Sequence, residues 1–256
     1  GGAQGLGAAM AMGFASHGAH TVLVDIAEEH VGETAAKIQT ASPNVRVLGW
    51  RCDVADQQSV QKMVDHVVSE LGEIDILHNN AAGKSKDLDA FFAPFEEYSL
   101  EQWREIMSVN LDGMFLVAQA VGKQMVEQDK GGSIIQTASI YGIMAPDPRI
   151  YEGSFYLGRQ ISSPAVYSAS KAGVIGLTKY LSAYWAGHKI RVNTLTPGGV
   201  ESGQNEIFKS LYSARVPLGR MADQDEMVGA LIYLASDASS YVTGQNIIVD
   251  GGLNAW

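Results

Sequence analysis

A tyrosine and a lysine lie four positions apart at Tyr167 and Lys171, so a helix would place both side chains on one face. A free tyrosine has a pKa of about 10 and is a poor base at neutral pH. A nearby ammonium lowers that pKa, which would let the phenol exchange a proton with a substrate hydroxyl. Taken alone, this spacing more often marks a surface pair that supports a helix. The pair indicates an enzyme only in the company of a cofactor site.

A glycine-rich loop opens the chain, with Gly1, Gly5 and Gly7 ahead of a helical pattern. Such glycines let a backbone approach a pyrophosphate, which then meets the helix N-terminus. The alternative for the loop alone is a flexible chain end. Asp25 lies twenty positions after Gly5, at the end of the next predicted strand, and Ile26 follows it. A carboxylate there would accept the adenine-ribose hydroxyls and repel a 2′-phosphate, so the pattern favours NAD over NADP. The alternative for Asp25 is a solvated strand-end carboxylate.

Six apolar runs alternate with helical patterns along the chain. This alternation predicts an α/β fold: a single-domain, doubly wound, Rossmann-type parallel sheet over residues 1–256, with helices on both faces. Because the chain begins inside the glycine loop, the first strand is missing from the sequence and is expected upstream; without it the sheet would expose two edges. Strands are predicted at 21–25, 45–51, 74–78, 132–138, 190–193 and 246–249, and long helices at 56–71, 99–124, 166–187 and 223–236.

Polar residues follow two of these strands. Asp53 comes after strand 45–51, and the segment 79–83 (Asn-Asn-Ala-Ala-Gly) comes after strand 74–78. Ligands bind at the carboxyl ends of strands in open α/β sheets. Taken singly, each of these residues is equally well explained as a turn former.

Charge and composition exclude several classes of function. The formal net charge is −10, and no basic run suggests a nucleic-acid partner or an anionic membrane surface. The single cysteine, Cys52, rules out an internal disulfide and favours a reducing, cytoplasmic compartment. The six histidines lack metal-ligand spacing, so no metal site is expected.

Together these motifs resemble the short-chain dehydrogenase/reductase family over the whole chain. The resemblance implies a nicotinamide cofactor and a catalytic tetrad in which Tyr167 transfers the proton and Ser139 holds the reacting oxygen. Lys171 would bind the nicotinamide ribose and lower the Tyr167 pKa, and Asn110 would hold a water beside Lys171. The matching residues, in the family's order, are Gly1, Gly5, Gly7, Asp25, Asp53, Asn79, Asn80, Ala81, Asn110, Ser139, Tyr167, Lys171, Pro197, Gly198, Asp250, Gly251 and Gly252.

The resemblance also implies a set of cofactor contacts, including Pro197-Gly198 over the nicotinamide. Two departures affect it: the family's Asn-Asn-Ala-Gly reads Asn-Asn-Ala-Ala, and Ser202 stands where relatives often place threonine. The predicted cofactor residues are Gly1, Gln4, Gly5, Leu6, Gly7, Asp25, Ile26, Asp53, Val54, Asn80, Ala81, Ala82, Tyr167, Lys171, Pro197, Gly198, Val200 and Ser202.

The largest departure is the distance from Ser139 to Tyr167, 28 positions, longer than the common family pattern. The added residues fall within 142–165, a loop that would border the substrate pocket. Arginine suits carboxylate, phosphate or sulfonate oxygens, and aromatic faces suit sugar rings. The equally weighted alternative is a subunit-contact loop. Predicted substrate contacts are Ser139, Tyr167, Arg149, Tyr151 and Arg159, with Glu152 and Tyr156 as further candidates.

Residues 201–216 are predicted to form a mobile lid, with an ordinary surface helix as the alternative. The insertion more weakly resembles oxidoreductases of unusual-sugar and flagellar-glycan pathways. The favoured hypothesis is an NAD-dependent dehydrogenase for a secondary alcohol of a sugar, a sugar acid (including anionic or sulfonated sugars) or a polyol. The alternatives are a 3-oxoacyl-type reductase and a non-catalytic NAD-binding sensor. The resemblance further implies a homotetramer, paired through helices 99–124 and 166–187.

Overall fold

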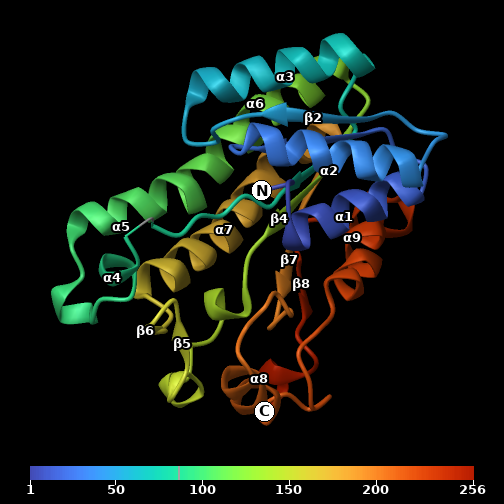
Figure 1. Cartoon of the computed structure of the whole chain (residues 1–256). Helices are drawn as coiled ribbons and strands as arrows, with labels where there is room; N and C mark the ends of the chain where they lie inside the picture. The colour runs from blue at the N-terminus through green and yellow to red at the C-terminus, as the bar shows by residue number, and fades with distance from the viewer. Residues whose placement is uncertain (86) are drawn as a thin grey trace.

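The computed structural model describes residues 1–85 and 87–256, and Figure 1 shows a layer of strands covered by helices. The strands of this layer are β1 (Thr21–Asp25), β2 (Val47–Arg51), β3 (Ile76–Asn79), β4 (Gly132–Thr137), β7 (Ile190–Pro197) and β8 (Asn246–Val249). The helices are α1 (Gly5–Ser16), α2 (Glu28–Ala41), α3 (Gln57–Leu71), α4 (Leu88–Phe91), α5 (Leu100–Met107), α6 (Gly113–Gln128), α7 (Ala165–Tyr184), α8 (Glu206–Ser213) and α9 (Val228–Ala235).

The strands pair in parallel as β2–β1 and as β3–β4–β7–β8. A cavity of about 470 Å³ lies between the two groups and is lined by 21–24 of β1, by 74–80 around β3 and by parts of α1. The described strands are therefore hydrogen-bonded in two parallel groups. The break between β1 and β3 leaves two edges that pair with no other described strand.

Apolar side chains fill both faces of the strands because neighbouring residues point to opposite sides. On β4, Ile134 packs with α3, α6 and α7, whereas Ile135 packs with Met10 of α1 and Leu231 of α9. All four of these side chains are buried. The doubly wound arrangement predicted from the continuous apolar runs is therefore confirmed.

Two regions predicted as continuous α-helices contain other kinds of helical turn in the structure. The region predicted as one helix over 99–124 consists of α5, a π-helical turn over Ser108–Asp112, and α6. The region predicted over 223–236 begins as a 3-10 turn over Gln224–Met227 and continues as α9. Local capping explains where the first helix begins, because Ser99 Oγ accepts a hydrogen bond from the Gln102 amide at 3.1 Å.

The insertion predicted over 142–165 is ordered by a small apolar cluster of its own. It contains a 3-10 turn over Pro148–Tyr151 and a hairpin of β5 (Phe155–Tyr156) and β6 (Arg159–Gln160). Tyr151 stacks on Phe208 of α8, with ring centroids 5.6 Å apart. The predicted lid, 201–216, thus contains α8, and α8 packs on the insertion.

Among the residues that the structure describes, no helix has the length and apolarity to cross a bilayer.

Candidate active site

The glycine loop and α1 form one wall of the site. Gly5 has φ +54°, a left-handed conformation that glycine adopts without strain. A Cβ on Gly7 would overlap the Gly1 carbonyl oxygen, so only glycine fits there. At the start of α1 the Gln4 side chain makes no capping hydrogen bond, which leaves amides of the first turn available to a ligand. A backbone cradle at a helix N-terminus fits the pyrophosphate of a dinucleotide.

Asp25 anchors this loop from the end of β1. Its Oδ2 accepts a hydrogen bond from the Ala3 amide at 3.0 Å, and its Oδ1 accepts one from the Ala27 amide at 3.1 Å. Burial alone would raise the pKa of Asp25, but the backbone hydrogen bonds from Ala27 and Ala3 act in the opposite direction, and the pKa is lowered. The carboxylate therefore stays ionised beside the loop. The neighbouring Ile26 is exposed.

The segment after β3 lies against the glycine loop. Asn80 Nδ2 donates to the Gly1 carbonyl oxygen at 3.3 Å, and a Cβ on Gly1 would meet Ala81 Cα at 2.9 Å. After β2, Asp53 Oδ1 accepts from the Ala55 amide at 3.0 Å, which is the turn-forming contact expected as its alternative role. The predicted cofactor residues from β1 and β3 thus come together at one edge of the strands.

Ser139, Tyr167 and Lys171 meet at the carboxyl end of β4. Ser139 follows this strand, and Tyr167 and Lys171 lie on α7. Lys171 is 2% exposed, and its Nζ donates to the Thr137 carbonyl oxygen at 3.0 Å. The same Nζ lies 5.9 Å from the centroid of the Tyr167 ring. The structure therefore brings the predicted proton-transfer residues into one group, in which Ser139 and Lys171 are buried and Tyr167 is half-buried.

Burial determines the protonation of this group. Burial raises the pKa of Tyr167, opposed by a hydrogen bond with Ser139. The lowered pKa expected from the sequence is not found in this structure, because desolvation of the phenolate is the larger effect. Burial also lowers the pKa of Lys171 to about 8. Tyr167 is accordingly a phenol at neutral pH, the form that can donate a proton to a carbonyl oxygen.

Asn110 lies fully buried in the π-helical turn and connects three segments. Its Oδ1 accepts from the Gly83 amide at 2.8 Å, and its Nδ2 donates to Ser170 Oγ at 3.5 Å. Ser170 Oγ in turn donates to the Tyr167 carbonyl oxygen at 2.8 Å. The turn interrupts the helix where Asn110 meets the β3 loop and the helix that carries Tyr167. Such π-helical turns often occur at functional sites.

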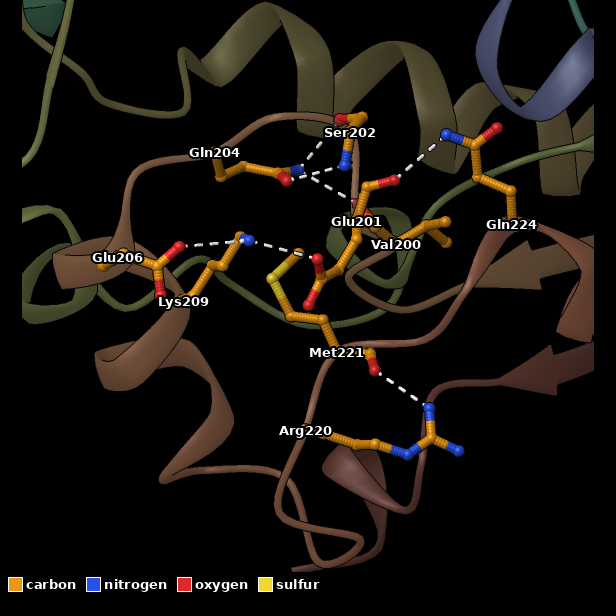
Figure 2. Close-up of polar contacts among 9 residues, drawn as sticks. All are labelled: Val200, Glu201, Ser202, Gln204, Glu206, Lys209, Arg220, Met221 and Gln224. Atoms are coloured by element: carbon orange, nitrogen blue, oxygen red, sulfur yellow. Dashed lines mark hydrogen bonds and ion pairs between the residues drawn. The ribbon is translucent and has the colours of Figure 1, made fainter.

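The loop after β7 closes another side of the site, and Figure 2 shows its polar contacts. Gln204 Nε2 donates to the Val200 carbonyl oxygen at 3.0 Å and to Ser202 Oγ at 2.9 Å. Gln224 Nε2 donates to the Glu201 carbonyl oxygen at 3.1 Å. The predicted Ser202 hydroxyl is thus held by Gln204. Beside it, Gly198 packs so tightly that a Cβ would meet Asp250 Cα at 2.7 Å.

The predicted substrate residues of the insertion occupy different environments. The Arg149 side chain is 81% exposed and binds Asp147, with Nη2 to Oδ2 at 2.7 Å. Arg159 forms an exposed ion pair with Asp89 near α4. Tyr151 is only 9% exposed and packs under α8. Of the three, Tyr151 lies nearest to the proton-transfer group, since Tyr167 is among the neighbours that affect its pKa.

Three polar residues near Tyr151 were not predicted. Tyr141 follows Ser139 by two positions, and Tyr212 and Arg215 lie on α8 and just beyond it. Tyr212 accepts a hydrogen bond from the Gly199 amide at 2.6 Å. Proximity of Tyr141 to Ser139 was the available sequence signal. No local pattern marks Arg215, because only the fold of the insertion brings it to the site.

Comparison with known proteins assigns the chain to a family. A family model described as enoyl-(acyl carrier protein) reductase matches residues 1–254. D-Threitol dehydrogenase of Mycolicibacterium smegmatis is 38% identical over 98% of this chain and 90% of the relative. This chain belongs to the short-chain dehydrogenase/reductase family. A 3-oxoacyl-[acyl-carrier-protein] reductase of Thermotoga maritima is 36% identical over 99% of this chain and 95% of its own length.

A solved member of the family has closely similar architecture. The gluconate 5-dehydrogenase of Burkholderia cenocepacia, determined in complex with NADP and tartrate, is 33% identical. It superposes with a TM-score of 0.86 over 100% of this chain and 93% of the gluconate enzyme. The family resemblance expected from the motifs is therefore confirmed over the whole chain. The α/β fold expected from the strand and helix pattern is confirmed with it.

Proposed function

We propose that this chain interconverts a secondary alcohol and a ketone on a sugar, a sugar acid or a polyol, using NAD(H). The observation that carries the proposal is the group of Ser139, Tyr167 and Lys171 at the carboxyl end of β4. Relatives named as a D-threitol dehydrogenase and a gluconate 5-dehydrogenase support a polyhydroxylated substrate.

Each residue of the group has a proposed role in ketone reduction. Ser139 holds the carbonyl oxygen beside Tyr167, because its hydroxyl already lies against that phenol. Tyr167 donates its proton to the oxygen as the C–H bond forms, and accepts a proton in the reverse, oxidising direction. Lys171 places a positive charge near the resulting phenolate and stabilises it. Asn110 fixes the position of α7, which carries Tyr167, relative to the loop after β3, because it hydrogen-bonds to both Ser170 and Gly83.

A nicotinamide dinucleotide fits the remaining residues and would supply or accept the hydride. The loop of Gly1, Gly5 and Gly7 would hold its pyrophosphate, and the β3 loop and 197–202 would line its far end. Asp25 supports NAD, because an ionised carboxylate at the end of β1 repels a 2′-phosphate. The NADP in the gluconate 5-dehydrogenase structure makes a direct comparison of the two cofactors necessary.

A 3-oxoacyl reductase is the second candidate, because the Thermotoga maritima relative bears that name. The two candidates differ in substrate polarity: a thioester-linked acyl chain is largely apolar, whereas a sugar or polyol carries hydroxyls on most of its carbons. An NAD-binding sensor is the third candidate and needs none of the proton-transfer residues. We also propose a cytoplasmic homotetramer, with no nucleic-acid or membrane partner, in keeping with the net charge and the single cysteine.

The test is a nicotinamide-absorbance screen of polyols, aldonic acids, sugars and acetoacetyl thioesters, each with NAD(H) and with NADP(H). Wild type should oxidise a polyol or sugar acid with NAD, and Tyr167→Phe should lose at least about 100-fold in kcat while still binding NADH. NADH fluorescence provides that binding control. A preference for NADP would contradict the role of Asp25. Turnover of the thioester alone would select the second candidate, and NADH binding without turnover of any substrate would select the sensor.

A further inference from the structure

A partly buried polar cluster lies under α8, and we define it as Tyr141, Asp147, Tyr151, Tyr212 and Arg215. Tyr141 and Tyr151 come from the two 3-10 turns after β4, and Tyr212 lies on α8 itself. Apolar side chains surround the cluster, and Phe208 stacks on the ring of Tyr151 and makes a tilted contact with the ring of Tyr212. The insertion and the predicted lid therefore meet around polar groups.

Two donors of this cluster have no acceptor. The Tyr141 hydroxyl and Arg215 Nη1 are buried, and within residues 1–85 and 87–256 neither has a partner in good hydrogen-bond geometry; the Tyr151 hydroxyl is the polar group nearest to that of Tyr141. A buried donor left unpaired costs free energy, which a bound acceptor would recover. Both atoms belong to the same cluster, since Arg215 and Tyr151 are among the neighbours that affect the Tyr141 pKa. The unpaired donors thus point to a common acceptor.

The charges of the cluster favour an anionic acceptor. Asp147 is already committed to Arg149, whose Nε and Nη2 approach its oxygens at 2.9 and 2.7 Å. Arg215 Nε reaches the same carboxylate only at 3.5 Å. One carboxylate therefore faces two guanidinium groups, and the group of Asp147, Arg149 and Arg215 carries a net positive charge. The other cation of this segment, Lys209, is held by Glu201 and Glu206 (Figure 2).

The cluster adjoins the proton-transfer group through Tyr151. Burial raises the pKa of Tyr151, and its neighbours include Tyr141 and Ser163 on one side and Tyr167 on the other. On the opposite side of the cluster, Tyr212 binds the Gly199 amide in the loop after β7. A substrate whose reacting carbon lies at Tyr167 would therefore extend past Tyr151 toward Tyr141 and Arg215 when α8 closes on it.

We propose that Arg215 and Tyr141 form a subsite for an oxyanion, most simply a carboxylate, carried by the substrate remote from its reacting carbon. The inference rests on the proposed function and narrows its substrate class to acidic sugars. The fork of Arg215 would pair with the oxyanion, and the Tyr141 hydroxyl would donate a second hydrogen bond. Closure of α8 is then coupled to the substrate, because only an acidic substrate satisfies both buried donors.

Matched four-carbon compounds provide the test. Threitol, threonate and tartrate share the same central diol and carry zero, one and two terminal carboxylates. Their binding to the NAD-loaded protein is measured by calorimetry, alongside NADH production from threitol and threonate. Wild type should bind tartrate and threonate at least about 10-fold more tightly than threitol. Arg215→Gln should abolish that preference, and Arg215→Lys should restore part of it.

Tyr141→Phe provides a variant that should fold normally, because it removes only an unpaired hydroxyl. It should keep or raise the melting temperature while weakening threonate binding several-fold and leaving threitol binding unchanged. Lys209→Gln removes a positive charge from α8 outside the cluster, and it should keep the preference for threonate. Equal binding of threitol and threonate by wild type would overturn the proposal. An undiminished preference in both Arg215→Gln and Tyr141→Phe would also overturn it.

The experiments can reject the oxyanion subsite and the proposed dehydrogenase function independently of each other. Oxidation of threitol without an Arg215-dependent preference for acids would preserve the dehydrogenase function and reject the oxyanion subsite. Arg215-dependent binding of threonate and tartrate without oxidation of any sugar, acid or polyol would preserve the subsite and reject the proposed function. Inorganic phosphate serves as a further probe of the oxyanion itself. Competition of phosphate with threonate in wild type, absent in Arg215→Gln, supports recognition of the oxyanion rather than of the diol.

Discussion

Lys171 shows how the environment of a residue determines its chemistry. Its ammonium is almost completely buried, and the Thr137 carbonyl oxygen is its hydrogen-bond acceptor. Desolvation opposes the charge and lowers the pKa of Lys171 to about 8. Tyr167 responds oppositely to the same burial, because its charged form is the deprotonated one. Both residues therefore favour their neutral forms more strongly than they would in water.

The first prediction concerns how this lysine affects stability. The folded-state pKa of about 8 lies below the ordinary value of 10.5, so between these pH values the unfolded chain binds more protons than the folded one. The free energy of unfolding of wild type, relative to Lys171→Met, should rise as pH increases from 8 to 10.5. The rise should approach about 3 kcal/mol, the energy of a shift of this size.

Urea unfolding of both proteins at matched pH measures that difference. Subtracting the Lys171→Met curve removes the contribution of tyrosines and other lysines that titrate in the same range. Below pH 8 the difference between the two proteins should be flat, because the ammonium is charged in both states. A difference that stayed flat up to pH 10.5, or that fell, would show that Lys171 is not desolvated as the structure indicates.

Residues whose role follows from local spacing could be predicted from sequence. Tyr167 and Lys171 are four positions apart on a helix, and Asp25 ends the strand after the glycine loop. Arg215 could not be found in this way, since its proximity to Tyr141 depends on how the insertion folds against α8. The pKa of Tyr167 was also beyond the sequence, because burial is a property of the surrounding packing.

At the scale of elements, the site depends on a break in a helix as well as on regular helices and strands. Apolar periodicity correctly predicted helical structure over 99–124, but it could not reveal the π-helical turn over Ser108–Asp112 because the apolar pattern continues through it. Likewise the aromatic residues of 142–165 indicated order without specifying a partner. The structure identifies α8 as that partner. Asn205 connects the two segments, since it caps α8 and also donates to the Phe155 carbonyl oxygen at 3.3 Å.

The second prediction concerns this connection. Asn205 Oδ1 accepts from the Phe208 amide at 2.9 Å, and Ser154 Oγ approaches the same oxygen at 3.4 Å. Asn205→Ala should destabilise α8 by about 1 kcal/mol, the usual cost of a lost N-cap, and loosen its contact with the hairpin. Amide hydrogen exchange in 206–213 should accelerate. KM for the substrate should rise more than kcat falls, because α8 is held less firmly against the insertion.

Asp56→Ala is the matched control for this variant. Asp56 caps α3 by accepting a hydrogen bond from the Gln58 amide at 2.9 Å, and α3 lies on the covered face of the strands. The control should lose a similar amount of stability while leaving exchange in α8 and KM unchanged. If both variants changed KM equally, general destabilisation would account for the effect and the coupling of α8 to the insertion would be rejected.

The whole molecule presents an aromatic surface that its own fold leaves uncovered. On α7, Tyr180 and Tyr184 are 64% and 65% exposed, and their rings stack with centroids 5.9 Å apart. Phe115 on the neighbouring α6 is also exposed. Since each chain carries a net charge of −10, association of copies must overcome electrostatic repulsion through apolar burial. Helices α6 and α7 provide such a surface, and the proposed tetramer uses it.

The third prediction tests this assembly. Sedimentation of wild type should give a mass about four times the 27.4 kDa of one chain. The double variant Tyr180→Glu and Tyr184→Glu should sediment as a dimer or monomer, because it adds two buried negative charges per chain to each interface. Tyr241→Glu is the control, since Tyr241 is fully exposed outside these helices and should leave the tetramer intact. A wild-type monomer, or a double variant that remains tetrameric, would refute association through α7.

Raising the salt concentration should strengthen wild-type assembly, because it screens the repulsion between acidic chains while apolar contact persists.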